Sequence, residues 1–209
     1  MNRHKILITI LLVLNSTCLF AKLPDSWFFR HFRLGAEWGY SQCLYRSWSY
    51  NYFSEEGYRV YDDQQGWLLR PNGSVFLQIG YDLSAKVNVA LNAGYLGTGE
   101  NNRLLPVLLR LSYFPKTTTA DGLFGWVQGG PALHFHTEER PVAWTESLGA
   151  GYRIALTEEC NLDFLLGVRL TQDHPLIPNP EAPGYVSRHN ILKNNAGYCA
   201  LDLTIAVNF

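Results

Sequence analysis

The sequence predicts an all-β protein, an eight-stranded antiparallel transmembrane β-barrel, and three observations lead to this fold. The 209 residues are 14% aromatic and only 17% charged, below the roughly 25% charge of ordinary soluble domains. Apolar side chains recur at every second position in eight separate runs. After the N-terminus, no stretch approaches the roughly 18 uninterrupted apolar residues that a membrane-spanning helix needs. A chain of this kind can cross a bilayer only as strands.

The N-terminal residues 1–21 have the pattern of a secretory signal peptide. Basic residues precede the apolar run 6–14, and the small residue Ala21 lies at the expected cleavage point. Cleavage after Ala21 leaves residues 22–209, which we expect to form a single barrel domain.

The charge balance excludes nucleic acid as a partner. The chain carries 17 Lys and Arg against 18 Asp and Glu, a formal net charge of −1, so it has no basic field to attract a phosphate backbone. The mature chain holds an odd number of cysteines without close spacing, so the sequence predicts neither a disulfide framework nor a zinc site. These cysteines are Cys43, Cys160 and Cys199.

The first four runs place apolar side chains on one face and small or polar side chains on the other. The first run starts the barrel and has these outward residues: Phe32, Leu34, Ala36, Trp38, Tyr40, Leu44, Trp48, Tyr50 and Tyr52. The second and third runs, 74–83 and 87–95, are joined by a tight connection at 84–86 and form a hairpin. The fourth run covers 107–113. The outward faces are apolar, so the sheet turns its apolar side to lipid and its polar side to a narrow interior.

The fifth run, residues 123–135, changes face along its length. It begins with Phe124 and Trp126 on one face and ends with Leu133 on the other. This slip predicts a β-bulge at 129–131, where Gly and Pro can host it. Regular alternation returns in the last three runs, 144–156, 162–171 and 201–209.

The connections between runs alternate in length. The longer ones lie on one side of the predicted sheet: 54–72, 98–103, 136–141 and 173–196. This asymmetry is typical of outer-membrane barrels, whose external loops are longer than their periplasmic turns. The rival fold is a secreted sandwich or lipocalin-type cup. Its polar face would carry abundant Lys and Glu, whereas here that face holds Gly, Ser, Ala and Asn.

The C-terminal stretch Tyr198 to Phe209 has apolar residues at alternate positions. Its outward members are Leu203, Ile205, Val207 and Phe209. This stretch resembles the signal that the outer-membrane assembly machinery recognises. From Phe32 to the end, the chain resembles the small eight-stranded outer-membrane proteins, such as the OmpA membrane domain, OmpX, OmpW and the PorT-like barrels of Bacteroidetes. The resemblance implies a place in the outer membrane of a Gram-negative bacterium, with outer-membrane lipid, lipopolysaccharide and the assembly machinery as partners.

The alternation places equal numbers of acidic and basic residues inside the barrel. They are Arg33, Glu37, Asp82, Arg110, Arg153, Asp163, Arg169 and Asp202. An eight-stranded barrel is just wide enough for side chains to fill, so these groups are expected to form a paired, hydrogen-bonded plug that excludes a general diffusion channel. A narrow path gated by rearrangement of these ions is the alternative.

Histidines and acids near the external end of the fifth run raise the alternative of an enzyme. Lipid A deacylases of this size use His, Ser and an acid, and His134, His136, Glu138, Glu139 and Ser147 lie in this region. The His-x-Ser spacing of that family is absent. Two His at a spacing of two share a face of a strand, but the sequence fixes no third metal ligand. We therefore predict no catalytic residue, no metal and no cofactor.

The predicted function is a structural, adhesive or accessory role through the external loops. Loops 54–72 and 173–196 carry Tyr58, Trp67 and Tyr185 among charges and prolines, a composition suited to an extracellular protein or glycan as partner. One alternative is a lipid A-modifying hydrolase. Another is an OmpW-like conduit for a small apolar ligand, which would need an apolar interior.

Overall fold

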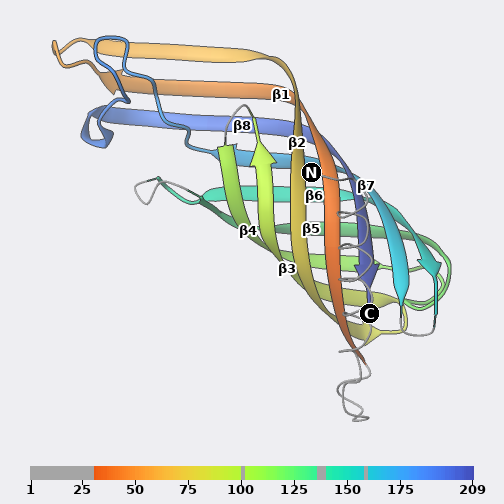
Figure 1. Cartoon of the computed structure of the whole chain (residues 1–209). Coiled ribbons are helices and arrows are strands. Elements are labelled where there is room, and N and C mark those ends of the chain that lie inside the picture. Colours follow the sequence, from red (N-terminus) through yellow and green to blue (C-terminus); the bar gives the residue numbers. More distant parts are fainter. Residues whose placement is uncertain (1–30, 100–101, 136–139, 158–159) are drawn as a thin grey trace, which may run out of the picture.

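The computed structural model is a closed barrel in which β1 to β8 pair in chain order and β8 closes against β1 (Figure 1). It describes residues 31–99, 102–135, 140–157 and 160–209. The strands are β1 (Phe32–Phe53), β2 (Arg59–Ser84), β3 (Val87–Thr98), β4 (Asn102–Tyr113), β5 (Gly122–His134), β6 (Ala143–Ala155), β7 (Asn161–Asp173) and β8 (Ile191–Asn208). All neighbours are antiparallel, so the predicted fold class is confirmed. The predicted signal peptide lies outside the described residues.

The outer face of the barrel is apolar, as the alternation predicts for six of the eight strands. On β2 and β4, Leu77 and Leu109 are exposed while Gln78 and Arg110 beside them are buried. The same alternation continues through β3, β6, β7 and β8. An apolar outer surface of this kind is suited to lipid rather than water. Among the described residues, no helix is long and apolar enough to cross a membrane.

The strand β1 departs from its predicted face halfway along. Its register with both neighbours shifts between Cys43 and Tyr45, and such an irregularity moves the following residues to the opposite face. The prediction that Trp48, Tyr50 and Tyr52 point outward is therefore wrong. These aromatic rings turn inward, where Tyr52 is buried against Ile177 and Val186.

The strand β5 lacks the bulge that the sequence predicts. Its register with β4 is constant from Leu105↔Leu133 to Tyr113↔Gly125, and its faces alternate without a slip. Phe124 and Trp126 instead point into the barrel and are buried.

Glycines on the facing strands make room for these two inward rings. A Cβ at Gly151 would collide with the Phe124 ring, and a Cβ at Gly149 would lie 2.8 Å from Cζ2 of Trp126. Gly149 and Gly151 on β6 and Gly167 on β7 are thus the counterpart of the inward aromatics on β5, and the pattern within β5 alone could not reveal this.

The first external connection is mostly strand rather than loop. The sequence predicts a loop at 54–72, but β1 and β2 form a hairpin that turns at Ser54–Tyr58 and pairs from Phe53↔Arg59 downward. Gly57 supplies the positive φ of 87° that this turn needs. From Trp48 to Tyr52 of β1, aromatic and polar residues alternate, which favours a strand over a loop.

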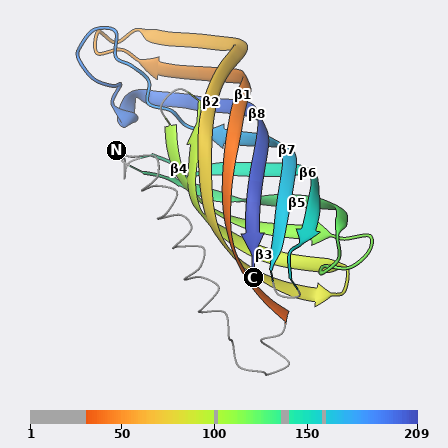
Figure 2. The same ribbon diagram turned by 45° about the vertical axis from the view of Figure 1, so that its right-hand side comes forward.

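This hairpin extends far beyond the other hairpins and, with the start of β8, forms a three-stranded sheet outside the barrel (Figures 1 and 2). We call this sheet the flap. It consists of residues 45–53 of β1, 59–73 of β2 and 191–195 of β8. It lies at the end with the longer connections, which is the extracellular end in outer-membrane barrels.

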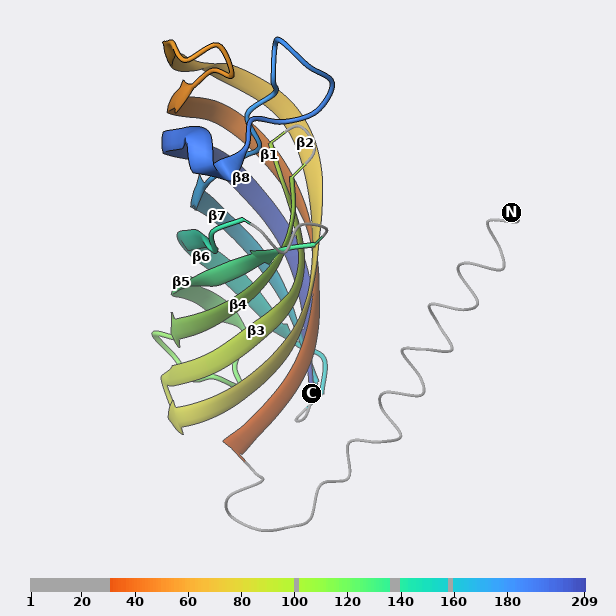
Figure 3. The same cartoon turned by 90° about the vertical axis from the view of Figure 1, so that its left-hand side faces the viewer.

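The connection from β7 to β8 is shorter than predicted and folds back on the flap. Its non-strand part is 174–190, which we call the strap, because 191–196 belong to β8. The Asn194 side chain donates to the Pro175 carbonyl over 2.6 Å, and Trp48 Nε1 donates to Asn194 Oδ1 over 2.9 Å. The strap is therefore tied to the inward face of the flap, and Figure 3 shows it as a separate loop beside the hairpin.

Replacing Gly149 with Ala tests the packing of the inward rings. The added methyl meets Trp126 and the Leu166 backbone, so we expect the free energy of unfolding to fall by about 1–3 kcal/mol, as overpacking typically costs. Urea unfolding in lipid vesicles measures this free energy, with the gel mobility of the folded barrel reporting the folded fraction. Gly125→Ala is the matched control because a Cβ there meets nothing within 4 Å. Equal stability of the two variants would contradict this packing.

Candidate functional site

The centre of the barrel holds a buried arginine–glutamate pair. Arg110 on β4 reaches across to Glu37 on β1 with both terminal nitrogens, and Nη2 donates to Oε2 over 2.9 Å. The two residues are 5% and 2% exposed. Arg110 also donates to Gln128 and lies 5.1 Å from the Trp126 ring centroid. The guanidinium of this β4 residue is thus held by groups from β1 and β5.

A second buried pair lies beside the first. Arg169 Nη1 is 3.1 Å from Asp202 Oδ2, and Nη2 donates to Ser41 over 2.6 Å. A cavity of about 20 Å³ separates the two pairs, which is room for about one water molecule. Arg169 Nε, Asp202 Oδ1 and Trp126 Nε1 border it without a hydrogen-bond partner among the described residues. Apolar side chains, among them Phe76, Leu96 and Leu108, also line this space, and it is too small to be a channel.

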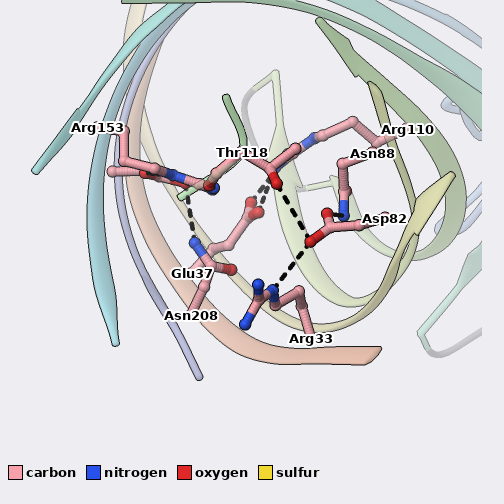
Figure 4. Close-up of polar contacts among 9 residues, drawn as sticks. Arg33, Glu37, Asp82, Asn88, Arg110, Thr118, Arg153 and Asn208 are labelled. Atoms are coloured by element: carbon pink, nitrogen blue, oxygen red, sulfur yellow. Dashed lines mark hydrogen bonds and ion pairs between the residues drawn. The ribbon is translucent and has the colours of Figure 1, made fainter. Parts of the chain in front are cut away.

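The other two pairs close the end of the barrel near the C-terminus. Arg33 Nε lies 3.1 Å from Asp82, which also accepts from Asn88 over 2.7 Å and from Thr118 over 3.3 Å. Figure 4 shows Asp82 at the centre of these donors.

On the other side of this end, Arg153 makes two bonds to Asp163, of 2.7 and 2.6 Å, and Asn208 adds a third of 2.8 Å. Arg153 also donates to the Thr118 carbonyl. Thr118 comes from the turn between β4 and β5, so this turn folds under the barrel and links the two pairs (Figure 4). The eight interior residues singled out in the sequence thus lie in four ion pairs.

Part of the interior is apolar, which the sequence analysis missed. A cluster of inward side chains fills the barrel toward the extracellular rim: Phe76, Leu96, Leu104, Leu108, Ala132 and Ala143. The alternation itself places Leu104 and Leu108 on the inward face of β4, and this pattern could have predicted an apolar part of the interior. The members are at most 6% exposed and pack against one another, and Phe76, Leu96 and Leu108 also border the cavity between the central ion pairs.

A buried histidine–aspartate pair lies at the extracellular rim and was also missed. His134 Nε2 at the end of β5 is 2.7 Å from Asp173 Oδ1 at the end of β7, and both side chains are buried. Asn102 donates to Asp173 over 2.7 Å, and Arg140 donates to Asn102 over 3.2 Å. The group ties β4, β5, β7 and the β5–β6 connection together. Asp173 continues the odd-numbered inward face of β7, which was the signal for it.

The residues named for the hydrolase alternative form no hydrogen-bonded Ser–His pair in the described part of the chain. Ser147 Oγ is buried inside β6 without a hydrogen-bond partner among the described residues, while His134 is engaged by Asp173. His136, Glu138 and Glu139 lie outside the described residues. Within the described part of the chain, no group of three His, Cys, Asp or Glu is arranged to hold a metal ion.

The flap carries exposed aromatic residues on its outward face. Trp67 is 78% exposed and meets Tyr45 edge to face at 6.2 Å, and Tyr61 and Leu69 on the same face of β2 are also exposed. Large apolar groups that stand clear of the barrel are typical of interaction surfaces.

The inward face of the flap is polar as well as aromatic. The Tyr50 hydroxyl donates to Asp62 over 2.8 Å and Gln64 donates to the same oxygen over 2.7 Å. These hydrogen bonds lower the pKa of the Asp62 carboxyl below its ordinary value. Burial first, and then the bond to Asp62, raise the pKa of Tyr50 to about 12. At physiological pH the pair is therefore a neutral phenol donating to a carboxylate.

The residues of the predicted assembly signal lie on the closing strand. Leu203 and Ile205 are exposed on the outer face of β8, and Val207 continues that face. Phe209 exchanges backbone hydrogen bonds with Leu34 at the start of β1, 2.7 and 3.0 Å long. The C-terminal strand therefore seals the barrel.

Comparison with solved structures finds this architecture in outer-membrane proteins. OprG of Pseudomonas aeruginosa matches with a TM-score of 0.53 at 13% sequence identity, over 86% of this chain and 96% of OprG. Neisserial surface protein A (NspA) matches with a TM-score of 0.41 at 12% identity, over 83% of this chain and 96% of NspA. No family model and no curated protein matches the sequence. The fold is that of the small outer-membrane barrels, and function must be argued from this chain's own residues.

Removing one member of the central ion pair tests its coupling. Arg110→Met leaves the Glu37 charge buried without its partner, so the free energy of unfolding should fall by about 3–5 kcal/mol. The double variant Glu37→Leu/Arg110→Met should recover most of that loss, since replacing a whole buried pair by apolar groups is often nearly neutral. Urea unfolding in vesicles compares these two variants with the single variant Glu37→Leu. A double variant as unstable as the sum of the two single variants would show that the residues are not coupled.

The Tyr50–Asp62 contact makes a prediction about pH. In Asp62→Asn, the pKa of Tyr50 should fall from about 12 toward 10 but not reach it, because burial, the largest cause, stays. Ultraviolet absorbance titration isolates Tyr50 as the difference between each protein and its Tyr50→Phe counterpart. An unchanged Tyr50 titration in Asp62→Asn would mean that the two side chains do not interact in solution.

Proposed function

We propose that this chain is a non-enzymatic integral outer-membrane protein in which a filled barrel anchors an extracellular binding surface, the flap. The observation that carries the proposal is the flap itself, a three-stranded sheet that extends beyond the other hairpins and exposes Tyr61, Trp67 and Leu69. An adhesive role fits this arrangement best.

The filled interior supports an anchor over a conduit. Four ion pairs and an apolar cluster occupy the lumen, and the space between the central pairs is about 20 Å³. A drug-sized ligand needs a pocket of roughly 300 Å³ or more. The apolar cluster is the feature that an OmpW-like conduit would use, but its side chains are packed together and the only opening that Phe76, Leu96 and Leu108 are described to border is the cavity of about 20 Å³.

The hydrolase alternative has less support from the described residues. A nucleophile needs a base within hydrogen-bond reach, and Ser147 Oγ, the candidate nucleophile, has no hydrogen-bond partner among the described residues. The outward apolar belt and the outward residues of β8 agree with lipid, lipopolysaccharide and the assembly machinery as partners of the barrel, and these partners belong to the same proposal.

Shortening the flap tests the proposal. Residues 48–64 are replaced by Asn-Gly, which makes a two-residue turn between Ser47 and Gln65, partners in the β1–β2 ladder. The same variant carries Trp67→Ser and Leu69→Ser, because the deletion alone removes Tyr61 but leaves these two exposed residues. We expect cells that carry the shortened protein to lose attachment to protein-coated and glycan-coated surfaces, while the barrel keeps the gel mobility of the folded form.

Two controls accompany this experiment. Trp38→Ala removes an aromatic ring that is exposed on the outer face of the barrel and should leave attachment unchanged. The second control tests the hydrolase alternative by mass spectrometry of lipid A from cells that carry the wild-type protein or the His134→Ala variant. Attachment that survives loss of the flap, or an acyl chain whose loss depends on His134, would overturn the proposal.

A further inference from the structure

The cavity between the two central ion pairs is bordered by polar atoms that the protein itself leaves unpaired. Arg169 Nε, Asp202 Oδ1 and Trp126 Nε1 have no hydrogen-bond partner in the described part of the chain, and all three residues line the cavity. Arg169 is 4% exposed and Trp126 is 7% exposed, and the Asp202 side chain is 13% exposed. Buried polar atoms are nearly always hydrogen-bonded, so three of them around one small space point to a ligand within it.

The three atoms come from three different strands. Trp126 lies on β5, Arg169 on β7 and Asp202 on β8. The Trp126 ring also lies beside the guanidinium of Arg110, which belongs to the other central pair. Among the described residues, no direct hydrogen bond joins the Arg110–Glu37 pair to the Arg169–Asp202 pair. A ligand that binds all three atoms would therefore connect the two pairs through Trp126.

The chemistry of these atoms selects a ligand that both accepts and donates hydrogen bonds. The N–H groups of Arg169 and Trp126 can only donate, whereas the Asp202 carboxylate can only accept. An anion could accept from the two N–H groups, but it would then face the carboxylate. A metal cation would face two N–H groups that offer it no lone pair. A water molecule accepts two hydrogen bonds and donates two, so a single molecule can satisfy all three atoms.

The size and the charge of the cavity agree with one water molecule. Its volume of about 20 Å³ exceeds the roughly 10–15 Å³ that a buried water needs, and it is too small for a larger molecule. The charged residues that line it are two arginines and two acids that already form ion pairs, so the cavity has no net charge to attract an ion. Buried waters typically make about three hydrogen bonds, which is the number that the three unpaired atoms offer.

We propose that this cavity is the binding site of one structural water molecule. The water accepts hydrogen bonds from Arg169 Nε and Trp126 Nε1 and donates one to Asp202 Oδ1. It is a long-lived member of the hydrogen-bond network of the lumen and connects the two central ion pairs. The inference concerns the barrel rather than the flap, so it goes beyond the proposed function and does not depend on it.

Nuclear magnetic resonance of the whole protein, labelled with ¹⁵N and refolded into deuterated micelles, tests this site. Cross-peaks between water and the N–H protons of Trp126 Nε1 and Arg169 Nε are recorded in the laboratory frame and in the rotating frame. A long-lived water in contact with a proton gives cross-peaks of opposite sign in the two experiments, whereas chemical exchange gives the same sign. We expect both protons to show the contact with water. The Trp126→Phe variant assigns the indole signal.

A control is needed for hydroxyl protons, because they exchange with water and can imitate this contact. The hydroxyl groups that line the cavity belong to Ser74 and Thr204. The variant Ser74→Ala/Thr204→Val removes both of them with little change in size. Both water contacts should remain in this variant.

A second variant removes two of the three proposed partners of the water. In Arg169→Met/Asp202→Leu the contact between water and the Trp126 indole proton should be lost. Replacing a whole buried ion pair by apolar groups is often nearly neutral for stability, and the gel mobility of the folded barrel checks that the variant folds. The matched control is Arg33→Met/Asp82→Leu, which removes an ion pair that does not line the cavity and should keep the contact.

Three results would overturn the inference. The first is a wild-type protein in which neither proton contacts water, and the second is loss of both contacts in Ser74→Ala/Thr204→Val. The third is a contact at Trp126 that survives in folded Arg169→Met/Asp202→Leu or disappears in folded Arg33→Met/Asp82→Leu, because other groups would then hold the water. If the Arg169→Met/Asp202→Leu variant does not fold, the wild-type protein and the hydroxyl-free variant decide the result.

Discussion

The pairing of charges inside a barrel too narrow for a continuous water channel is the constraint on which the rest of the structure depends. A charge taken out of water is costly unless a partner and hydrogen bonds compensate it. The four arginines of the lumen each meet a carboxylate from another strand. Each pair needs both strands in one register, so the ion pairs fix the order and offset of the strands as well as filling the space.

The same constraint separates the molecule into two parts with different chemistry. In the barrel, the outward side chains are apolar, and the interior holds the ion pairs together with buried apolar clusters. Past the rim, the irregularity between Cys43 and Tyr45 reverses the faces of β1, and the aromatic side of the strand can bury itself against the strap. This reversal allows three strands of the barrel wall, β1, β2 and β8, to continue as a sheet in water, with its own small core around Tyr52 and Ile177.

The sequence predicts the barrel well because period-two alternation is local and strong. Strands such as β2, with Leu77 outward and Gln78 inward, follow directly from it. It fails where a partner elsewhere in the chain decides. Phe124 and Trp126 point inward because Gly149, Gly151 and Gly167 leave space on other strands. Trp48 turns inward because of a register shift that the residue types around it do not predict. The His134–Asp173 contact joins residues that are 39 apart in the chain. Such features depend on three-dimensional neighbours that a single run of sequence does not contain.

Electrical recording from the purified protein in a planar lipid bilayer tests the central claim, a lumen filled by paired side chains, most directly. A barrel closed by four ion pairs and an apolar cluster should insert without producing a steady conductance over a range of voltages and salt concentrations. A stable, ohmic conductance from single inserted molecules would contradict it, because ions would then be crossing a lumen that the paired side chains are said to fill.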